Sequence, residues 1–235
     1  MNYKVIITTS GTGSRLKELT QKTNKALIDI NGKPTISYIL EKYDSNIPLV
    51  ITVGYLKDQI LNFFQNNYQD RQIEFVNIDP YEGPGSSLGF SLLQTESLAQ
   101  CPFIFHACDT IVTENIPIPD HNWAAAFPVT PNQDVSQYRT HKKDGSRLMQ
   151  INDKGITGYN AVHIGLTGIY DYKSFWQHLR RLYESRPKED TSLSDVHVIE
   201  AMLNDGIFFE SVDLPSWLDT GNIIALENAI NQLKN

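Results

Sequence analysis

Two glycines and a group of basic side chains follow the first apolar segment of the chain, residues 3–7. Gly11 and Gly13 leave the backbone free to bend closely around a ligand. The basic side chains that follow are Arg15, Lys17, Lys22, Lys25 and Lys33. A close backbone turn surrounded by cations is typical of a site that binds a polyphosphate.

The charge of the chain is distributed unevenly. Residues 1–34 hold six Lys or Arg and two Asp or Glu, a net charge of +4, which leaves −11 for the rest of a chain whose net charge is −7. A local basic patch in an acidic protein fits a small anionic ligand. It argues against a nucleic-acid partner, which needs basic residues spread over a broad face.

The glycine turn departs from two other phosphate-binding patterns. A dinucleotide-binding fingerprint requires a third glycine at position 16, where the chain has Leu16, and the Gly-Lys-Ser/Thr ending of a P-loop is absent. A purely structural turn between a strand and a helix is the competing interpretation. The neighbouring cations favour phosphate binding, and Lys25, beside the apolar residues 26–28, would be a point charge on a rigid element.

Two carboxylates follow strand-like segments elsewhere in the chain. Asp109 comes directly after the apolar residues 103–108, and Asp219 lies within Trp217-Leu-Asp-Thr-Gly221. Each alone is typical of a cap or a turn. Because proteins hold Mg²⁺ with one or two carboxylates together with substrate phosphates, the pair opposite a phosphate-binding turn predicts Mg²⁺ as the cofactor.

The remaining reactive side chains form no recognisable set. Cys101 and Cys108 have no His or Cys partner at metal spacing, which favours reduced thiols of a cytoplasmic protein. The six histidines provide no metal-spaced pair, and no Ser/His/Asp or Cys/His set can be assembled. No apolar segment approaches the roughly 20 residues that span a membrane, and the N-terminus does not have the pattern of a signal peptide. We therefore expect no membrane insertion.

Strand-like and helix-like segments alternate through the first half of the chain. Strands are expected at residues 3–8, 48–53, 72–77 and 103–107, and helices at 35–43, 56–66 and 86–96. This alternation predicts an α/β fold of βαβ units with a mostly parallel sheet, and 235 residues allow one large domain or two small ones. Ligands bind outside the carboxyl ends of such strands, where the glycine turn and Asp109 are placed.

The second half is less regular and predicts small additional β elements on the substrate side. Strands are expected at 123–130, 162–172 and 207–212, and helices at 173–185, 194–204 and 223–233. Ser194 or Asp195 is the expected N-cap of its helix. Residues 131–143 are polar and without a clear period, so we interpret them as a loop or insertion near the substrate.

These motifs resemble those of the nucleotidyltransferases that activate sugar 1-phosphates. The specific similarities are Gly11-Thr-Gly-Ser-Arg-Leu16, Leu19-Thr20, Asn24-Lys25, Gly32-Lys33-Pro34 and Trp217-Leu-Asp-Thr-Gly221. The weaker ones are the loop Gly83-Pro-Gly-Ser-Ser-Leu88, Asp109, Asp153-Lys154 and Thr167-Gly-Ile-Tyr170. The matches run in family order from residue 3 to residue 221.

The resemblance implies the sugar nucleotidyltransferase (Rossmann-like) variant of the α/β doubly wound fold, with a mostly parallel sheet, as a single domain over residues 1–235. It also implies a Mg²⁺-dependent reaction in which an NTP and a sugar 1-phosphate give a nucleotide sugar and pyrophosphate, for surface polysaccharide or glycan precursors. Arg15 and Lys25 would be the catalytic residues, and Asp109 and Asp219 the metal ligands. The implied nucleotide-binding residues are Thr9, Ser10, Gly11, Thr12, Gly13, Ser14, Gly83, Gly85, Ser86 and Ser87, and the implied acceptor-binding residues are Lys154, Gly168 and Tyr170.

The chain also departs from the family pattern. Residues 8–11 read Thr-Thr-Ser-Gly, Asn24 replaces a proline, and no glutamine precedes Gly83. These departures leave open a cytidylyltransferase with a non-sugar acceptor, such as choline phosphate, a phosphonate or a polyol phosphate. A catalytically inactive nucleotide-binding regulator is a third interpretation, against which the two carboxylates facing a basic turn argue. The expected partners are an NTP and a phosphorylated small molecule, and a homo-oligomer is compatible with the sequence.

Overall fold

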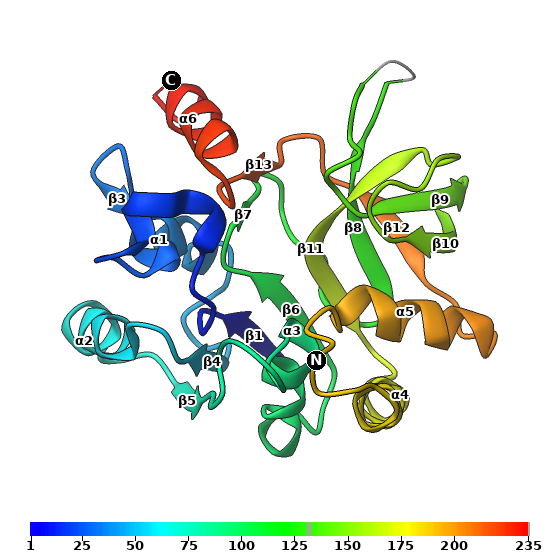
Figure 1. Cartoon of the computed structure of the whole chain (residues 1–235), viewed down its shortest axis with the longest axis horizontal. Helices are drawn as coiled ribbons and strands as arrows, with labels where there is room; N and C mark the ends of the chain where they lie inside the picture. Colours follow the sequence, from blue (N-terminus) through cyan, green and yellow to red (C-terminus); the bar gives the residue numbers. More distant parts are fainter. Residues whose placement is uncertain (131–132, 235) are drawn as a thin grey trace.

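The computed structural model describes residues 1–130 and 133–234. Within these residues the main sheet has nine strands in the order β5-β4-β1-β6-β11-β8-β12-β10-β9 (Figure 1). The strands are β1 (Lys4–Thr8), β4 (Leu49–Val53), β5 (Ile73–Asn77), β6 (Phe103–Ala107), β8 (Trp123–Pro128), β9 (Thr140–Asp144), β10 (Arg147–Asn152), β11 (Ala161–Ile169) and β12 (Glu210–Asp213). The helices are α1 (Thr35–Leu40), α2 (Lys57–Asn67), α3 (Leu88–Leu93), α4 (Tyr172–Ser185), α5 (Asp195–Asn204) and α6 (Ile223–Gln232).

Strands β5, β4, β1 and β6 are parallel and form one half of the sheet. Their sequences are rich in apolar and β-branched residues, and β4 is buried along its whole length. This is the pattern of a strand covered on both faces. The alternation of strands and helices that the sequence predicts is therefore found here, and the carboxyl ends of β1 and β6 meet at one edge of the sheet.

The other half of the sheet is mixed, which corrects the expected mostly parallel arrangement. Strand β11 is antiparallel to β6, to β8 and to β9, and β10 is antiparallel to β9 and β12. Only β12 runs parallel to a neighbour in this half, β8. Ligands bind at the carboxyl ends of parallel strands. An antiparallel strand has its amino end at that edge of the sheet, so its first residues, not its last, lie near the site.

The segment 131–143, expected to be a loop, ends in a strand instead. Residues 140–143 belong to β9, which forms a hairpin with β10 around Asp144 and Gly145. Residues 131–132 lie outside the described residues. The outer face of β9 carries exposed Lys142, so the sequence of this strand contains no apolar run that would predict it. The Asp144-Gly145 pair, in contrast, is a recognised hairpin signal.

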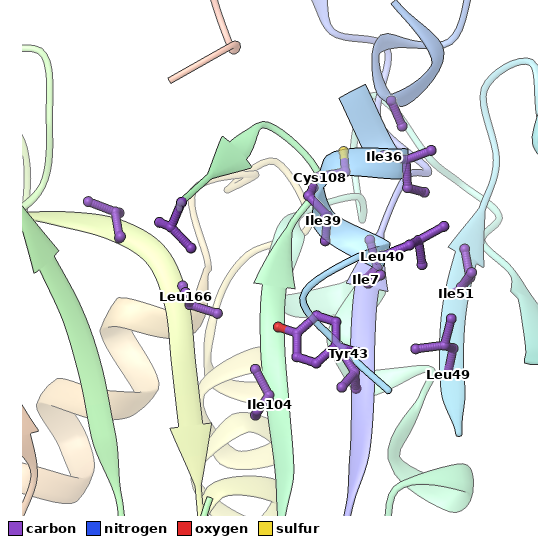
Figure 2. Close-up of a cluster of buried hydrophobic side chains, with 14 of the residues drawn as sticks. Ile7, Ile36, Ile39, Leu40, Tyr43, Leu49, Ile51, Ile104, Cys108 and Leu166 are labelled. Atoms are coloured by element: carbon purple, nitrogen blue, oxygen red, sulfur yellow. The ribbon is translucent and has the colours of Figure 1, made fainter. Parts of the chain in front are cut away.

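Apolar side chains cover both faces of the sheet. On one face Ile7 of β1 packs with residues of α1 and β4, as Figure 2 shows for Ile36, Ile39 and Ile51. On the other face Ile6 of β1 belongs to a cluster built from α3, α4 and α5. Because alternate residues of a strand point to opposite faces, the apolar run of β1 joins both layers. The turn that follows β1 is thus attached to a rigid base.

Two short strands bring distant parts of the chain to the carboxyl edge of β6. β7 (Thr110–Ile111) pairs antiparallel with β13 (Leu218–Asp219), so that Asp219 lies opposite Thr110. Helix α6 follows, with Asn222 as its N-cap through a 3.0 Å bond from the amide of Ala225. Among the described residues, no helix combines the length and the apolar character that crossing a membrane requires.

Candidate active site

The turn after β1 is held in place by buried polar contacts. Thr9 is fully buried and donates through its hydroxyl to the carbonyl of Thr52 at 2.6 Å. Gly13 has φ of 67°, and a Cβ there would lie 3.1 Å from Cβ of Lys25. A side chain at position 13 would therefore be strained and crowded, and the turn lies directly against the segment that carries Lys25.

Asn24, which replaces the proline of the family pattern, connects that segment to the residues that closely follow β1 and β4. Its side-chain oxygen accepts from the amide of Ala26 at 3.0 Å and caps the short 3₁₀ helix Lys25–Leu27. Its side-chain amide donates to the carbonyls of Thr9 at 3.0 Å and Tyr55 at 2.8 Å. Asn24 is fully buried, so its polar atoms are satisfied where water does not reach. The departure thus gives Lys25 a rigid support.

Lys25 and Arg15 converge on Asp109. Nζ of Lys25 lies 3.0 Å from Oδ2 of Asp109, and Nη2 of Arg15 lies 3.9 Å from the same oxygen. Burial favours a neutral Asp109, but Lys25 and then Arg15 outweigh it and lower the pKa of the carboxyl. Burial likewise opposes the charge of Lys25, and Asp109 overcomes it and raises the pKa of the ammonium. Both groups are ionised at neutral pH.

Asp219 is the second carboxylate of the site. Its Oδ1 accepts from the amide of Gly221 at 2.7 Å, and its Oδ2 accepts from the hydroxyl of Tyr138 at 3.0 Å. Burial, followed by the charge of Asp109, raises the pKa of Asp219. A carboxylate whose pKa is raised by the charge of another lies close to it, and a bound cation would relieve this repulsion.

Gly221 defines a place between these charged groups. A Cβ at Gly221 would lie 3.0 Å from Oδ2 of Asp109, 3.0 Å from Oδ1 of Asp219 and 3.0 Å from Nη2 of Arg15. Two carboxylate oxygens and a guanidinium therefore face one small space. In the described part of the chain no group of three His, Cys, Asp or Glu side chains is arranged to hold a metal. The donor set is that of Mg²⁺ held by two carboxylates with substrate phosphates, so the residues present fit this ion.

A cavity of about 470 Å³ opens beside this cluster. Its basic lining residues are Arg15, Lys25, Arg139 and Lys154. Burial, then the charges of Arg15 and Arg139, lower the pKa of Lys154, which indicates that these three cations face a common region. Four cations beside a carboxylate pair suit a ligand with several phosphates.

The loop that contains Gly83 forms another wall of the cavity. Ser86 and Ser87 line it, together with Tyr81 and Glu82, two residues that the sequence interpretation did not single out. Ser87 caps α3 by accepting from the amide of Phe90 at 2.9 Å. Gly83 and Gly85 have φ of 75° and 87°, a conformation that favours glycine. On the β1 side, Ser10, Gly11 and Thr12 line the cavity, whereas the lining does not include the other predicted nucleotide-binding residues, Thr9, Gly13, Ser14, Gly83 and Gly85.

Two of the three predicted acceptor-binding residues lie elsewhere, which is a correction. Gly168 lies opposite Ile104 on β6, towards the end of that strand remote from Ala107, and its Cα faces Trp123 so closely that a Cβ would lie 2.2 Å from the indole. Tyr170 follows the same end of β11 and is 47% exposed. Because β11 is antiparallel to β6, its residues His163, Ile164 and Gly165 line the cavity instead. Lys154, the third predicted residue, does line it.

The structure also brings together residues that sequence reasoning did not connect. His163 lies between His141 and Asp195, at 3.0 Å and 2.9 Å respectively, and both His163 and Asp195 border the cavity. These residues come from β11, β9 and α5. No local pattern links them, so only the folded chain identifies the group. Ser194, the N-cap of α5, forms a capping box with His197, as the sequence predicted for Ser194 or Asp195.

Comparisons with known proteins are consistent with this geometry. No family model matches the chain. A choline-phosphate cytidylyltransferase of Haemophilus influenzae is 32% identical over 175 residues, which cover 73% of this chain and 67% of that protein. The bifunctional protein GlmU of Methanococcus maripaludis is 33% identical over 84 residues, 35% of this chain. The match spans about a fifth, 20%, of the length of GlmU.

Solved structures show the same fold over nearly the whole chain. The CTP:phosphocholine cytidylyltransferase of Streptococcus pneumoniae matches with a TM-score of 0.76 and 21% identity, covering 99% of this chain and 100% of that one. The UDP-glucose pyrophosphorylase of Acinetobacter baumannii matches with a TM-score of 0.77 and 17% identity, covering 99% and 93%. Together with the 32% identity to the Haemophilus protein, the motifs and the fold show that the chain belongs to the sugar-phosphate nucleotidyltransferase family, which includes the choline-phosphate cytidylyltransferases.

Proposed function

We propose that the protein transfers a nucleoside monophosphate from an NTP to the phosphate of a small acceptor and releases pyrophosphate. The observation that carries this proposal is the space beside Gly221, which Asp109, Asp219 and Arg15 face together. Beside it, Lys25 and Lys154 add positive charge to the same cavity. Such an arrangement suits a substrate that brings several negative charges and a divalent cation.

Asp109 and Asp219 would hold Mg²⁺, which when bound neutralises the phosphates and polarises the reacting phosphorus. The backbone of residues 11–14 would hold the triphosphate, with the side chains of Thr9 and Ser10 anchoring that turn. Arg15, whose side chain is 58% exposed, would bind the departing pyrophosphate. Lys25 would bridge the phosphate that is attacked and the phosphate of the acceptor.

The chain need not supply a general base for this reaction. A phosphate nucleophile is already ionised near neutral pH, so the protein positions the two substrates in line and stabilises charge. Lys154 would bind the acceptor phosphate. Its ammonium lies in the basic part of the cavity, with Arg139 nearby.

A sugar 1-phosphate is the acceptor that we propose first. The wall formed by Gln137, Arg139, His163, Thr191 and Asp195 is polar and suits the hydroxyl groups of a sugar. Two cations, Arg139 and Lys154, are part of this side, and they would attract the phosphate of the acceptor. The polar wall therefore supports a hydroxylated acceptor.

Choline phosphate is the second candidate. It is favoured by the match to the Haemophilus choline-phosphate cytidylyltransferase, which spans 73% of the chain, whereas the match to the Methanococcus GlmU covers 35%. Tyr138 and Trp217, whose ring centroids lie 5.3 Å apart, both line the cavity and offer aromatic surface to a trimethylammonium group. CTP would be the nucleotide in that case.

The test is a matrix of the four NTPs against phosphorylated acceptors, with pyrophosphate release as the readout. Hexose 1-phosphates, choline phosphate, a polyol phosphate and a phosphonate form the acceptor panel, and the unphosphorylated parent compounds are the controls. We expect turnover with one or a few pairs and none with the parents. NTP binding without turnover for any pair would support an inactive regulator, and turnover of unphosphorylated acceptors would contradict the proposed phosphate nucleophile.

A further inference from the structure

A continuous line of hydrogen bonds runs from β12 to the wall of the cavity through two histidines. Oγ of Ser211 lies 3.0 Å from Nδ1 of His141, and Nε2 of His141 lies 3.0 Å from Nδ1 of His163. Nε2 of His163 lies 2.9 Å from Oδ2 of Asp195. All four residues are at most 8% exposed. The line ends at Asp195, which borders the cavity.

The protonation of the groups along this line determines which atom donates a hydrogen bond to Asp195. Burial, and then the neighbouring His163, lower the pKa of His141 well below its ordinary value, so this ring is neutral. With His163 neutral, Ser211 donates to His141 and His141 donates to His163; with His163 protonated, both of these bonds reverse. In each arrangement Nε2 of His163 carries a proton and donates to Asp195, because an ionised carboxylate only accepts.

Asp195 retains its charge and part of its capacity to accept hydrogen bonds. Burial opposes its ionisation, but the hydrogen bond and charge of His163 outweigh burial and lower the pKa of Asp195. Asp195 is also the first residue of α5, where the helix dipole favours a negative charge. A carboxylate has about four acceptor positions; His163 uses one of them and the backbone amide of Val196 another. This leaves acceptor capacity for a donor in the cavity.

The position of Asp195 indicates which substrate it faces. A carboxylate repels phosphate groups, so it suits a part of a substrate that carries none. Strand β11, which contributes His163, borders β6 on the side opposite to β1 and its glycine turn. Relative to Asp109 at the end of β6, the NTP turn is therefore on one side, and His163 with Asp195 on the other. That side is the one left for the acceptor.

We propose that Asp195, oriented by His163, accepts a hydrogen bond from a hydroxyl group of the acceptor and so selects acceptors that carry a hydroxyl group besides their phosphate. His163 and His141 act as positioning residues that hold the carboxylate in one orientation. This inference rests on the proposed transfer to a phosphorylated acceptor and specifies the acceptor class.

The first test uses Asp195→Asn with a matched control at the other end of the same helix. Asp205 follows α5 and accepts from Nε2 of His178 at 2.9 Å. This is a His–Asp pair like that of His163 and Asp195, but neither of its residues lines the cavity. We expect Asp195→Asn to raise the KM of the acceptor about 10- to 100-fold, the effect of losing one hydrogen bond to a charged group. The Kd of the NTP, measured by calorimetry without acceptor, should stay unchanged. Asp205→Asn should change neither.

The second test does not depend on the folding of Asp195→Asn. The wild-type protein is assayed with its best acceptor and with the singly deoxygenated analogues of that acceptor. One analogue should lose about 10- to 100-fold in kcat/KM, and in Asp195→Asn that difference should disappear. His163→Gln should raise the acceptor KM in the wild-type background but add little to Asp195→Asn, since both act through one contact.

The outcomes separate this inference from the proposed function. A wild-type protein that turns over its acceptor, all deoxy analogues and choline phosphate equally well would overturn the role of Asp195 alone. So would an Asp195→Asn variant that weakens NTP binding as much as acceptor binding. A wild-type protein that releases no pyrophosphate with any pair would overturn the proposed function, and this inference with it.

Discussion

Nζ of Lys25 lies 3.0 Å from Oδ2 of Asp109. In the free protein, the group proposed to bind phosphate therefore forms an ion pair with the group proposed to bind Mg²⁺. Under the proposed function, a cation on Asp109 takes over as partner of the carboxylate. The ammonium then becomes available to the phosphates that arrive with the cation. Metal and nucleotide binding would therefore be coupled through this pair.

Lys25→Ala should reduce turnover about 10²- to 10³-fold, as the loss of one donor to transition-state charge does. It should also raise the KM of the acceptor, because under the proposed function Lys25 bridges the two phosphates. Lys25→Arg should not restore full activity, since a planar fork replaces a compact charge poorly. Exposed Lys22, in the same segment, provides the control variant Lys22→Ala. Steady-state kinetics test this, and wild-type kinetics in Lys25→Ala would remove Lys25 from the site.

Asp109→Asn and Asp219→Asn should each nearly abolish turnover without unfolding the protein. Each change removes one charged ligand from the proposed cation, and the cost should reach at least about 10²- to 10³-fold in rate. The measurement is pyrophosphate release across a Mg²⁺ titration. A variant with near-normal turnover at limiting Mg²⁺ would show that the residue in question is not a ligand.

The same two substitutions should change stability in opposite directions when no metal is present. The folded protein lowers the pKa of Asp109, so its charge stabilises the fold above the pKa of the unfolded chain, and this contribution is lost as the pH falls through the folded value. The folded protein raises the pKa of Asp219, so the ionised form costs stability once the pH rises through the folded value.

At pH 7 with a chelator present, Asp109→Asn should therefore unfold at a lower temperature than the wild type, and Asp219→Asn at an equal or higher one. Each kcal/mol should shift Tm by about 2–4 °C in a chain of this length. Both differences should shrink in acid: that of Asp219→Asn as the pH falls through its raised pKa, and that of Asp109→Asn only below the ordinary pKa of a carboxyl group. Thermal unfolding followed by circular dichroism measures this, and a Tm of Asp219→Asn that does not rise relative to the wild type as the pH rises would contradict the repulsion between the two carboxylates.

The sequence predicted the parts of the site that follow parallel strands. The glycine turn after β1 and Asp109 after β6 lie at one edge because the carboxyl ends of parallel strands meet there. Asp219 joins them through β13, as its motif implied. The orientation of β11 could not be read from its apolar residues. The predicted Gly168 and Tyr170 therefore lie at the wrong end of the strand, and His163 takes the place at the cavity.

Other features depend on contacts between distant segments. His141, His163 and Asp195 lie on β9, β11 and α5, which the fold brings together. Their spacing in the sequence does not predict that they form one line of hydrogen bonds. The β9–β10 hairpin, in contrast, carried a readable signal in Asp144 and Gly145. Its polar outer face obscured the alternation that identifies a strand.

Gly221→Ala provides the sharpest test of where the cation lies. The backbone at Gly221 does not adopt the left-handed conformation that favours glycine, so alanine itself is not strained there. Its methyl group would lie 3.0 Å from Asp109, Asp219 and Arg15 and would fill the space that these groups share. We expect turnover to fall about 10²- to 10³-fold and the rise in Tm on adding Mg²⁺ with NTP to disappear. The Tm of the metal-free protein should change little, since the methyl group displaces no apolar core residue. If Gly221→Ala retains both wild-type turnover and stabilisation by Mg²⁺ with NTP, the cation binds elsewhere, and the pairing of Asp109 with Asp219 needs another explanation.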